Sequence, residues 1–304
     1  MDVPFYWVDV FAATPLTGNP LALVPDADVL PIETMRAVAR EFNQSETTFL
    51  VSPDGDGADH RLRSFTPAGV EVYGAGHNAM GAWIWLALAG RLDPTRDTFV
   101  QQIGDALLNV RVSLRARVSE RPSSGVQVTM EQSAPRFLGR VEDRAALAAV
   151  LGLGVDDVGG ASVGVAGGGA EVVSTGAEHL LVPVRSIKAV DAVQPDTAAL
   201  RALLADAGAE GCYVYTTDVE GGISAYARFF NPTVGIAEDP ATGTAAGPLA
   251  AVLARDGLVR DPARIVVEQG RALGRPSLIT LGAAGPVVTI TGSGTVAAEG
   301  TLHL

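Results

Sequence analysis

Glu46 is the first candidate for acid–base chemistry in this sequence. It lies in the string Asn43-Gln44-Ser45-Glu46-Thr47, between an expected helix at 32–42 and an expected strand at 47–51. A carboxylate at such a junction can point into a cleft and lose part of its hydration, which raises its pKa toward neutral pH. The alternative is a solvated loop glutamate, which is the commoner case for a glutamate in such a position.

A second candidate segment begins at Gly76, His77 and Asn78, where an expected helix at 77–89 starts. Backbone N–H groups at a helix start have no partners within the helix, and glycine lets a ligand approach closely, so this segment could bind an anion. His77 could donate a hydrogen bond or transfer a proton; the alternative is a capping or core histidine. The segment 74–79 also matches a loose dinucleotide-binding pattern, but the strand before it is short and alternating, which disfavours that interpretation.

A third candidate is the string EDPATGTA at 238–245, which leads into an expected helix at 244–255. An Asp–Pro pair fixes an extended residue before a turn. The Thr-Gly-Thr that follows supplies two hydroxyls and further N–H groups at a helix start. The alternative is an ordinary N-terminal cap, because Asp and Thr are common capping residues.

The second and third candidates have the same surroundings. Phe65-Thr66-Pro67 precedes Gly76-His77, and Phe230-Asn231-Pro232 precedes Gly243-Thr244. Each unit consists of a strand, a turn containing proline, a loop, and a glycine and a polar residue that open a helix. If the repeat is genuine, two similar halves each point a helix N-terminus at a shared anion site; the alternative is chance, because Gly and Pro are abundant in this chain.

Composition restricts the partners. The chain has 304 residues and a formal net charge of −12, from 34 acidic and 22 basic residues. An acidic surface repels phosphate backbones and anionic lipid, so we expect neither a nucleic acid nor a membrane surface as partner. The single cysteine, Cys212, and the absence of a signal-peptide pattern favour a cytoplasmic protein.

Other catalytic schemes find no support in the residues present. The four histidines show no metal-binding spacing, so we expect no metal site. The sequence has neither a Gly-x-Ser-x-Gly elbow nor a phosphate-binding Walker loop. Cys212 lies in an expected core strand, which indicates a structural role.

Taken together, these strings resemble the PhzF-like family, named for a phenazine-biosynthesis isomerase and related in fold to diaminopimelate epimerase and proline racemase. The resemblance extends over nearly the whole chain, in one order and spacing. The strings that carry it are Val8-Asp9-Val10-Phe11, Gly18-Asn19-Pro20, Asn43-Gln44-Ser45-Glu46-Thr47, Phe65-Thr66-Pro67, Gly76-His77, Glu238-Asp239-Pro240-Ala241-Thr242-Gly243-Thr244-Ala245, Gln269-Gly270 and Gly274-Arg275-Pro276-Ser277.

The resemblance implies an α+β fold of two similar halves, each a curved, mostly antiparallel sheet wrapped around a central helix. The first half would comprise 1–118 plus about 288–304 and the second 124–287, on either side of a Pro/Ser/Gly linker at 121–125. The site would lie between the halves, and the usual assembly of the family is a homodimer.

The resemblance also implies a cofactor-independent isomerase that transfers a proton within a small carboxylate-bearing metabolite, for which a cyclic form is one option. The alternatives are an epimerase or racemase of an amino-acid-like substrate and a non-catalytic ligand-binding protein. Asn78-Ala79-Met80 and the lengthened loop at 67–71 depart from the family pattern. The implied catalytic residues are Glu46, His77 and Asp239, and the implied substrate-binding residues are Gly76, Asn78, Gly243, Thr244 and Ala245.

Overall fold

The computed structural model describes residues 1–114, 125–159 and 169–304 of the chain. The predicted linker at 121–125 lies outside the described residues except for Gly125. No helix among the described residues is long and apolar enough to cross a lipid bilayer.

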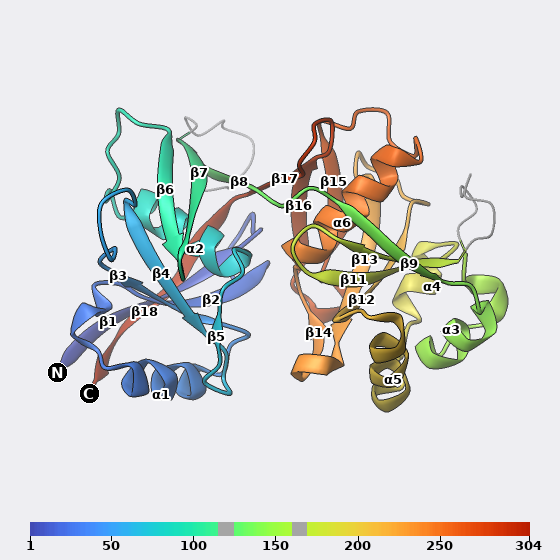
Figure 1. Cartoon of the computed structure of the whole chain (residues 1–304), viewed down its shortest axis with the longest axis horizontal. Helices are drawn as coiled ribbons and strands as arrows, with labels where there is room; N and C mark the ends of the chain where they lie inside the picture. The colour runs from blue at the N-terminus through green and yellow to red at the C-terminus, as the bar shows by residue number, and fades with distance from the viewer. Residues whose placement is uncertain (115–124, 160–168) are drawn as a thin grey trace. The chain divides into compact units, whose positions relative to one another are not determined.

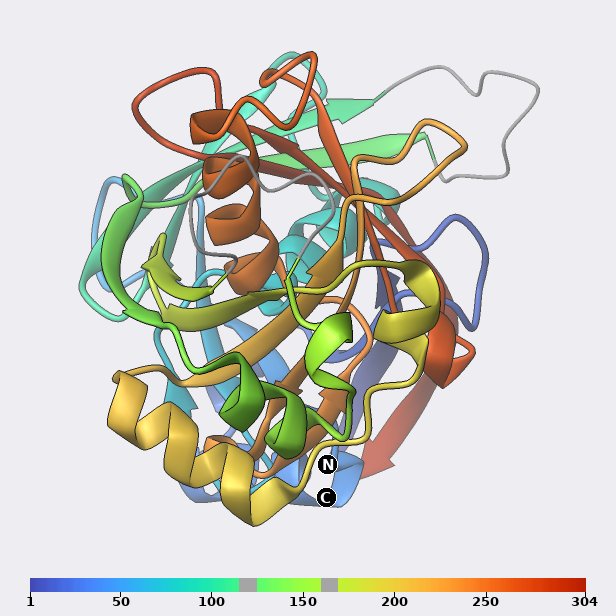
Figure 2. The same ribbon diagram turned by 90° about the vertical axis from the view of Figure 1, so that its right-hand side faces the viewer.

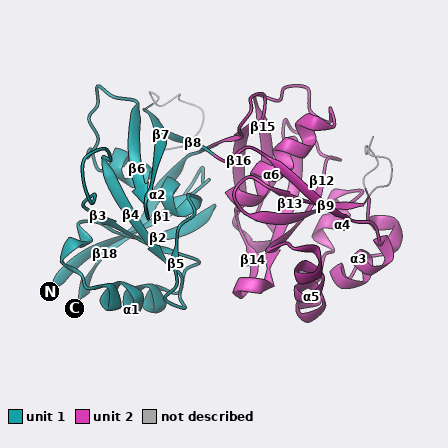
Figure 3. Cartoon of the chain, viewed as in Figure 1, with its two compact units in different colours: residues 1–131, 291–304 teal, residues 132–290 magenta. Residues whose placement is uncertain are grey.

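The chain forms two compact units (Figure 1). Unit 1 comprises Met1–Glu131 and Thr291–Leu304, so both termini belong to it, and unit 2 comprises Gln132–Ile290 (Figure 3). Strand β17 (Thr289–Gly292) covers the point at which the chain passes from unit 2 back to unit 1.

Unit 1 contains a mostly antiparallel sheet. β1 pairs with β18 and with β2, β3 with β4, β4 with β5, β6 with β7, and β7 with β8, all antiparallel. The β2–β3 and β4–β6 pairs are parallel, and a helix lies in each of the connections between their strands. The strands are β1 (Asp2–Val10), β2 (Asn19–Val24), β3 (Thr47–Val51), β4 (His60–Phe65), β5 (Glu71–Val72), β6 (Thr98–Ile103), β7 (Ala106–Leu114), β8 (Val126–Glu131) and β18 (Gly294–His303).

The two α-helices that the structure describes in unit 1 differ in how they are buried. α1 (Ile32–Phe42) is amphipathic and buries Met35, Val38 and Ala39 in a core cluster with strand residues, which confirms the helix predicted at 32–42. α2 (His77–Leu88) is apolar on nearly every side, and most of its residues are buried. It packs against β1, β2, β3, β4, β7, β8 and β18, as expected of a helix that is hydrophobic all round.

Unit 2 contains a second mostly antiparallel sheet. β10 pairs with β9 and β11, β12 with β13, β13 with β14, and β15 with β16, all antiparallel, while β11–β12 and β13–β15 are parallel. The strands are β9 (Arg136–Val141), β10 (Ala170–Ser174), β11 (Glu178–Pro183), β12 (Gly211–Thr216), β13 (Ala225–Asn231), β14 (Ile236–Asp239), β15 (Ile265–Gln269) and β16 (Ser277–Gly282).

Four α-helices occur among the described residues of unit 2. α3 and α5 contact each other, and Figure 2 shows them side by side in green and gold. α6 is largely buried and packs against β10, β11 and β16. The α-helices are α3 (Arg144–Leu151), α4 (Ile187–Asp191), α5 (Thr197–Ala207) and α6 (Gly243–Arg255); short 3₁₀ turns occur at Ala27–Val29 in unit 1 and at Val155–Asp157, Pro232–Val234 and Arg271–Leu273 in unit 2.

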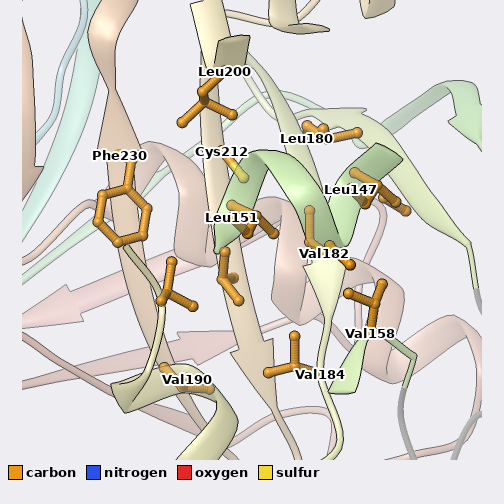
Figure 4. Close-up of a cluster of buried hydrophobic side chains, with 14 of the residues drawn as sticks. Leu147, Leu151, Val158, Leu180, Val182, Val184, Val190, Leu200, Cys212 and Phe230 are labelled. Atoms are coloured by element: carbon orange, nitrogen blue, oxygen red, sulfur yellow. The ribbon is translucent and has the colours of Figure 1, made fainter. Parts of the chain in front are cut away.

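A cluster of buried apolar side chains holds α3, α4 and α5 against the sheet of unit 2 (Figure 4). Cys212 is one of its members and is fully buried, beside residues such as Leu151 and Phe230. Burial raises the pKa of its thiol to about 12, so the thiolate does not form at neutral pH. The predicted structural role of Cys212 is therefore confirmed.

The same series of strand pairings occurs in both units. From β1 to β7 the successive pairings are antiparallel, parallel, antiparallel, antiparallel, parallel and antiparallel. The series is identical from β10 to β16. α2 and α6 occupy the same place in it, each following the short strand β5 or β14. The repeat inferred from the two Phe-x-Pro segments therefore corresponds to a repeat of strand topology.

We predict that Gly81→Ala destabilises unit 1. Alanine ordinarily favours a helix over glycine by about 1 kcal/mol. At Gly81, however, an added Cβ would lie 2.5 Å from Leu21 Cδ2 and 2.9 Å from Val10 Cγ2, so overpacking should lower the free energy of unfolding by roughly 1–3 kcal/mol. Denaturant unfolding measures the change. Gly55→Ala, where a Cβ meets nothing within 4 Å, is the control, and a Gly81→Ala protein as stable as that control would contradict the packing described for α2.

Candidate functional site

Glu46 lies in the short connection between α1 and β3. α1 ends at Phe42 and is followed by Asn43, whose left-handed backbone (φ 50°) turns the chain sharply; Thr47 then enters the sheet opposite Phe65. The Glu46 side chain is 20% exposed, but its Oε2 atom is buried and makes no hydrogen bond with any described residue. This loss of hydration raises the pKa of Glu46 to about 7, and a hydrogen bond from Ser45 opposes the increase. The raised pKa of Glu46 agrees with the interpretation of this residue as a partly desolvated carboxyl group.

His77 is the first residue of α2 and lies beside Glu46. Its Nε2 atom is 3.2 Å from Glu46 Oε2 and 3.4 Å from Ser45 Oγ. The imidazole is nearly buried, with 10% of its side chain exposed. A carboxyl group with a pKa near neutrality can both hold and release a proton at neutral pH, which is what general acid–base catalysis requires, and the adjacent imidazole is a second group of the kind used in such catalysis.

Asn78 organises the loop that leads into α2. Its Oδ1 accepts a hydrogen bond from the Gly76 N–H at 2.7 Å, and its Nδ2 donates to Ser64 Oγ at 3.1 Å and to Gly74 O at 3.0 Å. The amide side chain is buried, and both of its hydrogens are engaged within unit 1. The Gly76 N–H is also already engaged. Binding of an anion at this helix start would therefore fall to the backbone of the first turn of α2.

Asp239 ends β14 and belongs to a buried hydrogen-bond network. Its Oδ2 accepts a hydrogen bond from the Thr242 hydroxyl. The Gln269 side chain donates to Asp239 O at 2.8 Å and to Thr242 Oγ1 at 3.1 Å, and it accepts from the Thr242 N–H at 3.1 Å. The side chains of Asp239, Thr242 and Gln269 thus hold the loop before α6 in place. The sequence motif around Gln269 marked its position in the chain, but gave no sign of this role.

Gly243, Thr244 and Ala245 form the first turn of α6. The Gly243 carbonyl accepts a hydrogen bond from Gln132, and the Ala245 N–H donates to Thr242 O at 3.2 Å. Thr244 Oγ1 lies 3.2 Å from Nε2 of His179, a buried residue of β11 that sequence analysis did not single out. Burial lowers the pKa of His179 to about 4, so its imidazole is neutral at physiological pH.

Each unit also contains a bidentate arginine–glutamate pair just ahead of its candidate loop. In unit 1, Arg63 Nε and Nη2 each lie 2.8 Å from a carboxylate oxygen of Glu71, which joins β4 to β5. In unit 2, Arg228 Nε lies 2.9 Å from Glu238 Oε1 and Arg228 Nη2 lies 2.8 Å from Glu238 Oε2. This pair joins β13 to β14. Paired hydrogen bonds of this kind are strong and directional. They hold the strands from which the two loops start, and each arginine lies two residues before the phenylalanine of a Phe-x-Pro segment.

The structure brings the predicted residues together in two groups. Glu46, His77 and Asn78 lie in unit 1, and Asp239 and Thr244 lie in unit 2 at the start of α6. Within residues 1–114, 125–159 and 169–304, no group of three or more His, Cys, Asp or Glu side chains is arranged to hold a metal ion.

Comparisons with known proteins agree with the motifs. A family model described as phenazine biosynthesis-like protein matches residues 8–300. A trans-2,3-dihydro-3-hydroxyanthranilate isomerase of Pseudomonas fluorescens is similar to this chain, with 34% identity over 307 aligned positions that cover 98% of both proteins. Among solved structures, a PhzF-family phenazine biosynthesis protein of Bacillus anthracis has a TM-score of 0.87 at 24% identity, covering 100% of both chains. A hydroxyproline epimerase of Agrobacterium vitis shares the fold, with a TM-score of 0.62 at 11% identity over 99% of this chain and 91% of its own.

We predict that replacing Glu46 by glutamine stabilises the protein at high pH. The unfolded chain releases this proton near pH 4.5, whereas the folded protein retains it until about pH 7. Ionisation of Glu46 therefore opposes folding increasingly as the pH rises through that window, by about 3 kcal/mol at most. The Glu46→Gln variant should match the wild type at pH 4 and exceed its free energy of unfolding above pH 7.

Urea unfolding at pH 4, 6 and 8 measures this difference. Glu41→Gln, which changes an exposed glutamate of α1, is the control and should leave the pH dependence unaltered. A constant difference between Glu46→Gln and wild type at all three pH values would contradict the raised pKa.

Proposed function

We propose a reaction for this chain, which belongs to the phenazine biosynthesis-like family, as its motifs predicted, and is an isomerase. In this proposal the protein transfers a proton within a small carboxylate-bearing metabolite, with Glu46 as the general acid and base. A cyclic substrate is one form of this proposal, since the similar Pseudomonas fluorescens protein is named for a dihydro-hydroxyanthranilate. The departures at Asn78-Ala79-Met80 leave room for a different ring or chain.

The observation that carries the proposal is the state of the Glu46 carboxyl group. Its Oε2 atom is buried without a hydrogen bond to any described residue, 3.2 Å from His77 Nε2, and its pKa is about 7. A structural carboxylate is normally hydrogen-bonded or paired with a cation, because an unpaired buried charge is costly. A carboxyl group that keeps one buried oxygen without a hydrogen bond, at a pKa near neutrality, is suited to exchange a proton with a substrate.

The proposed reaction needs one proton and no electron acceptor. The Glu46 carboxylate removes a proton from a substrate carbon, and the electron pair of that C–H bond shifts to move the double bond. The protonated Glu46 then returns the proton to another carbon of the same molecule and is again ionised. The substrate is neither oxidised nor reduced, so the proposal includes no cofactor.

The other predicted residues would support this transfer. His77 and Asp239 would polarise or reprotonate the substrate, as the family resemblance implies. Thr244 would donate a hydrogen bond to the substrate. The segments Gly76–Asn78 and Gly243–Ala245 would contribute to substrate binding, because the helix dipole at each helix start favours negative charge.

Unit 2 has no carboxylate at the position that matches Glu46. Thr47 pairs with Phe65 in unit 1, and Cys212 pairs with Phe230 in unit 2, so Thr47 and Cys212 are equivalent. The residues that precede them, Glu46 and Gly211, are therefore equivalent too. A Cβ at Gly211 would lie 2.4 Å from the Phe229 ring, which excludes any side chain there without rearrangement. This difference supports a reaction with one carboxylate base rather than epimerisation between two equivalent bases.

The proposal includes the finer description of the fold and assembly. Each sheet would curve around its central helix, α2 or α6, and the strand pairings and helix contacts within each unit support this arrangement. A cytoplasmic homodimer would be the working form, as the family resemblance implies.

We predict that Glu46→Gln abolishes turnover while leaving ligand binding nearly intact. Glutamine keeps the shape of the side chain but cannot accept and return the proton, and loss of a general base costs roughly 10²–10⁴-fold in rate. Ultraviolet absorbance of trans-2,3-dihydro-3-hydroxyanthranilate follows turnover, and calorimetry with 3-hydroxyanthranilate follows binding. Glu41→Gln should retain full activity, and a Glu46→Gln protein with wild-type turnover would refute the assignment of Glu46.

A further inference from the structure

His179 is a buried histidine of unit 2 that the proposed mechanism does not use. It lies on β11 with 2% of its surface exposed, and its Nε2 atom is 3.2 Å from Thr244 Oγ1. We propose that His179 is a positioning residue that donates a hydrogen bond to the Thr244 hydroxyl and thereby directs the Thr244 O–H toward an oxygen acceptor on the substrate. This inference rests on the proposed function, because it assigns Thr244 to the substrate site.

Packing holds the His179 ring in one orientation. The Phe229 ring meets it edge-on, with centroids 5.0 Å apart and an interplanar angle of 83°. On the side of Nδ1 lies Gly211, where an added Cβ would be only 3.2 Å from that nitrogen. Nδ1 is buried and has no hydrogen-bond partner among the described residues. Among the described residues, the Thr244 hydroxyl is therefore the hydrogen-bond partner of the ring.

The surroundings of the ring decide which nitrogen carries the proton. Burial keeps the imidazole neutral, so one nitrogen is a donor and the other an acceptor. A proton on Nδ1 would leave a buried N–H without an acceptor, and such orphaned donors are rarer in native proteins than underused acceptors. The proton on Nε2 leaves only a lone pair unused at Nδ1. The favoured tautomer thus has Nε2–H donating to Thr244 Oγ1.

This hydrogen bond restricts what Thr244 can do. A hydroxyl has one hydrogen to donate and two lone pairs to accept with, and His179 takes one of the lone pairs. The hydroxyl hydrogen must then point elsewhere, while the β-branched side chain limits the rotamers available on the helix. Thr244 can then donate this hydrogen to a carboxylate or carbonyl oxygen of the substrate, because His179 does not compete for it.

The matching position in unit 1 argues against a purely structural role for His179. Cys212 and Thr47 are equivalent, and their parallel-strand partners are Leu180 and Ala22. The residues that precede these partners, His179 and Leu21, are therefore equivalent too. Leu21 is also fully buried. An apolar side chain therefore fills this place in the same strand topology. The residue matching Thr244 in unit 1 is His77, so the histidine–threonine contact belongs to unit 2 alone.

The tautomer can be measured without any ligand. In protein labelled with ¹⁵N-histidine, long-range proton–nitrogen spectra should show His179 as the neutral Nε2–H form from pH 5.5 to 8, assigned by its loss in His179→Gln. Replacing Thr244 by valine should shift the Nε2 resonance. An Nδ1–H form, a charged ring in this range or an unchanged Nε2 resonance in Thr244→Val would overturn the proposal.

Binding of 3-hydroxyanthranilate, measured by calorimetry, tests the consequence for the substrate. His179→Met removes the donor and should weaken binding about tenfold. His179→Gln, whose amide N–H₂ can reach the same hydroxyl, should restore binding to within about twofold of wild type. In a Thr244→Val background, His179→Met should have no further effect. Equal losses in the Met and Gln variants, or an undiminished loss without the Thr244 hydroxyl, would overturn the proposal.

The two measurements separate this inference from the proposed function. If wild-type protein does not bind the aromatic carboxylate while the Nε2–H tautomer and its dependence on Thr244 are observed, the choice of substrate is wrong and the hydrogen bond stands. If the ligand binds but the tautomer is Nδ1–H, the assignment of His179 is wrong and the proposed function is unaffected.

Discussion

The incomplete hydration of the Glu46 carboxyl group is the constraint on which the rest of the site depends. Its pKa of about 7 requires burial, yet a fully paired carboxylate would not exchange its proton. The left-handed turn at Asn43 and the entry of Thr47 into the sheet place Glu46 at the edge of the core. The start of α2 then brings His77 within 3.2 Å. Helix end, strand register and helix start must all be maintained to keep this one carboxyl group poorly solvated.

The two units share a topology but differ in the chemistry of equivalent positions. Both contain the same series of strand pairings and a bidentate arginine–glutamate pair before the loop that leads to the central helix. At the equivalent positions, however, Glu46 corresponds to Gly211 and His77 to Thr244. Unit 1 thus contains the proposed acid–base residues Glu46 and His77, and unit 2 contains a buried network around Asp239 together with a threonine hydroxyl. This division is consistent with a single proton carried by one carboxylate.

Much of the scaffold could be predicted from sequence because its signals are local. The helix expected at 32–42 corresponds to α1, and the Gly-polar pairs predicted the starts of α2 and α6 within one residue. The side-chain contacts of the site could not be predicted, since they depend on strand register between distant segments. The contact between His179 and Thr244 spans 65 residues, and nothing near His179 in the chain distinguishes it from an ordinary core histidine. The position of Asn78 at a helix start likewise did not predict its hydrogen bonds to the loop that precedes it.

The pH at which Glu46 ionises decides whether it can act as the acid and base proposed for it. Infrared difference spectra, recorded between pH 4 and 9 with ¹³C-labelled glutamate, follow the loss of the carboxylic acid band, and the band that disappears in Glu46→Gln identifies the residue. We predict that this carboxyl group titrates near pH 7, because an acid or base that transfers protons at neutral pH needs a pKa in that range. A Glu46 that titrates near 4.5, like a solvated glutamate, would contradict it.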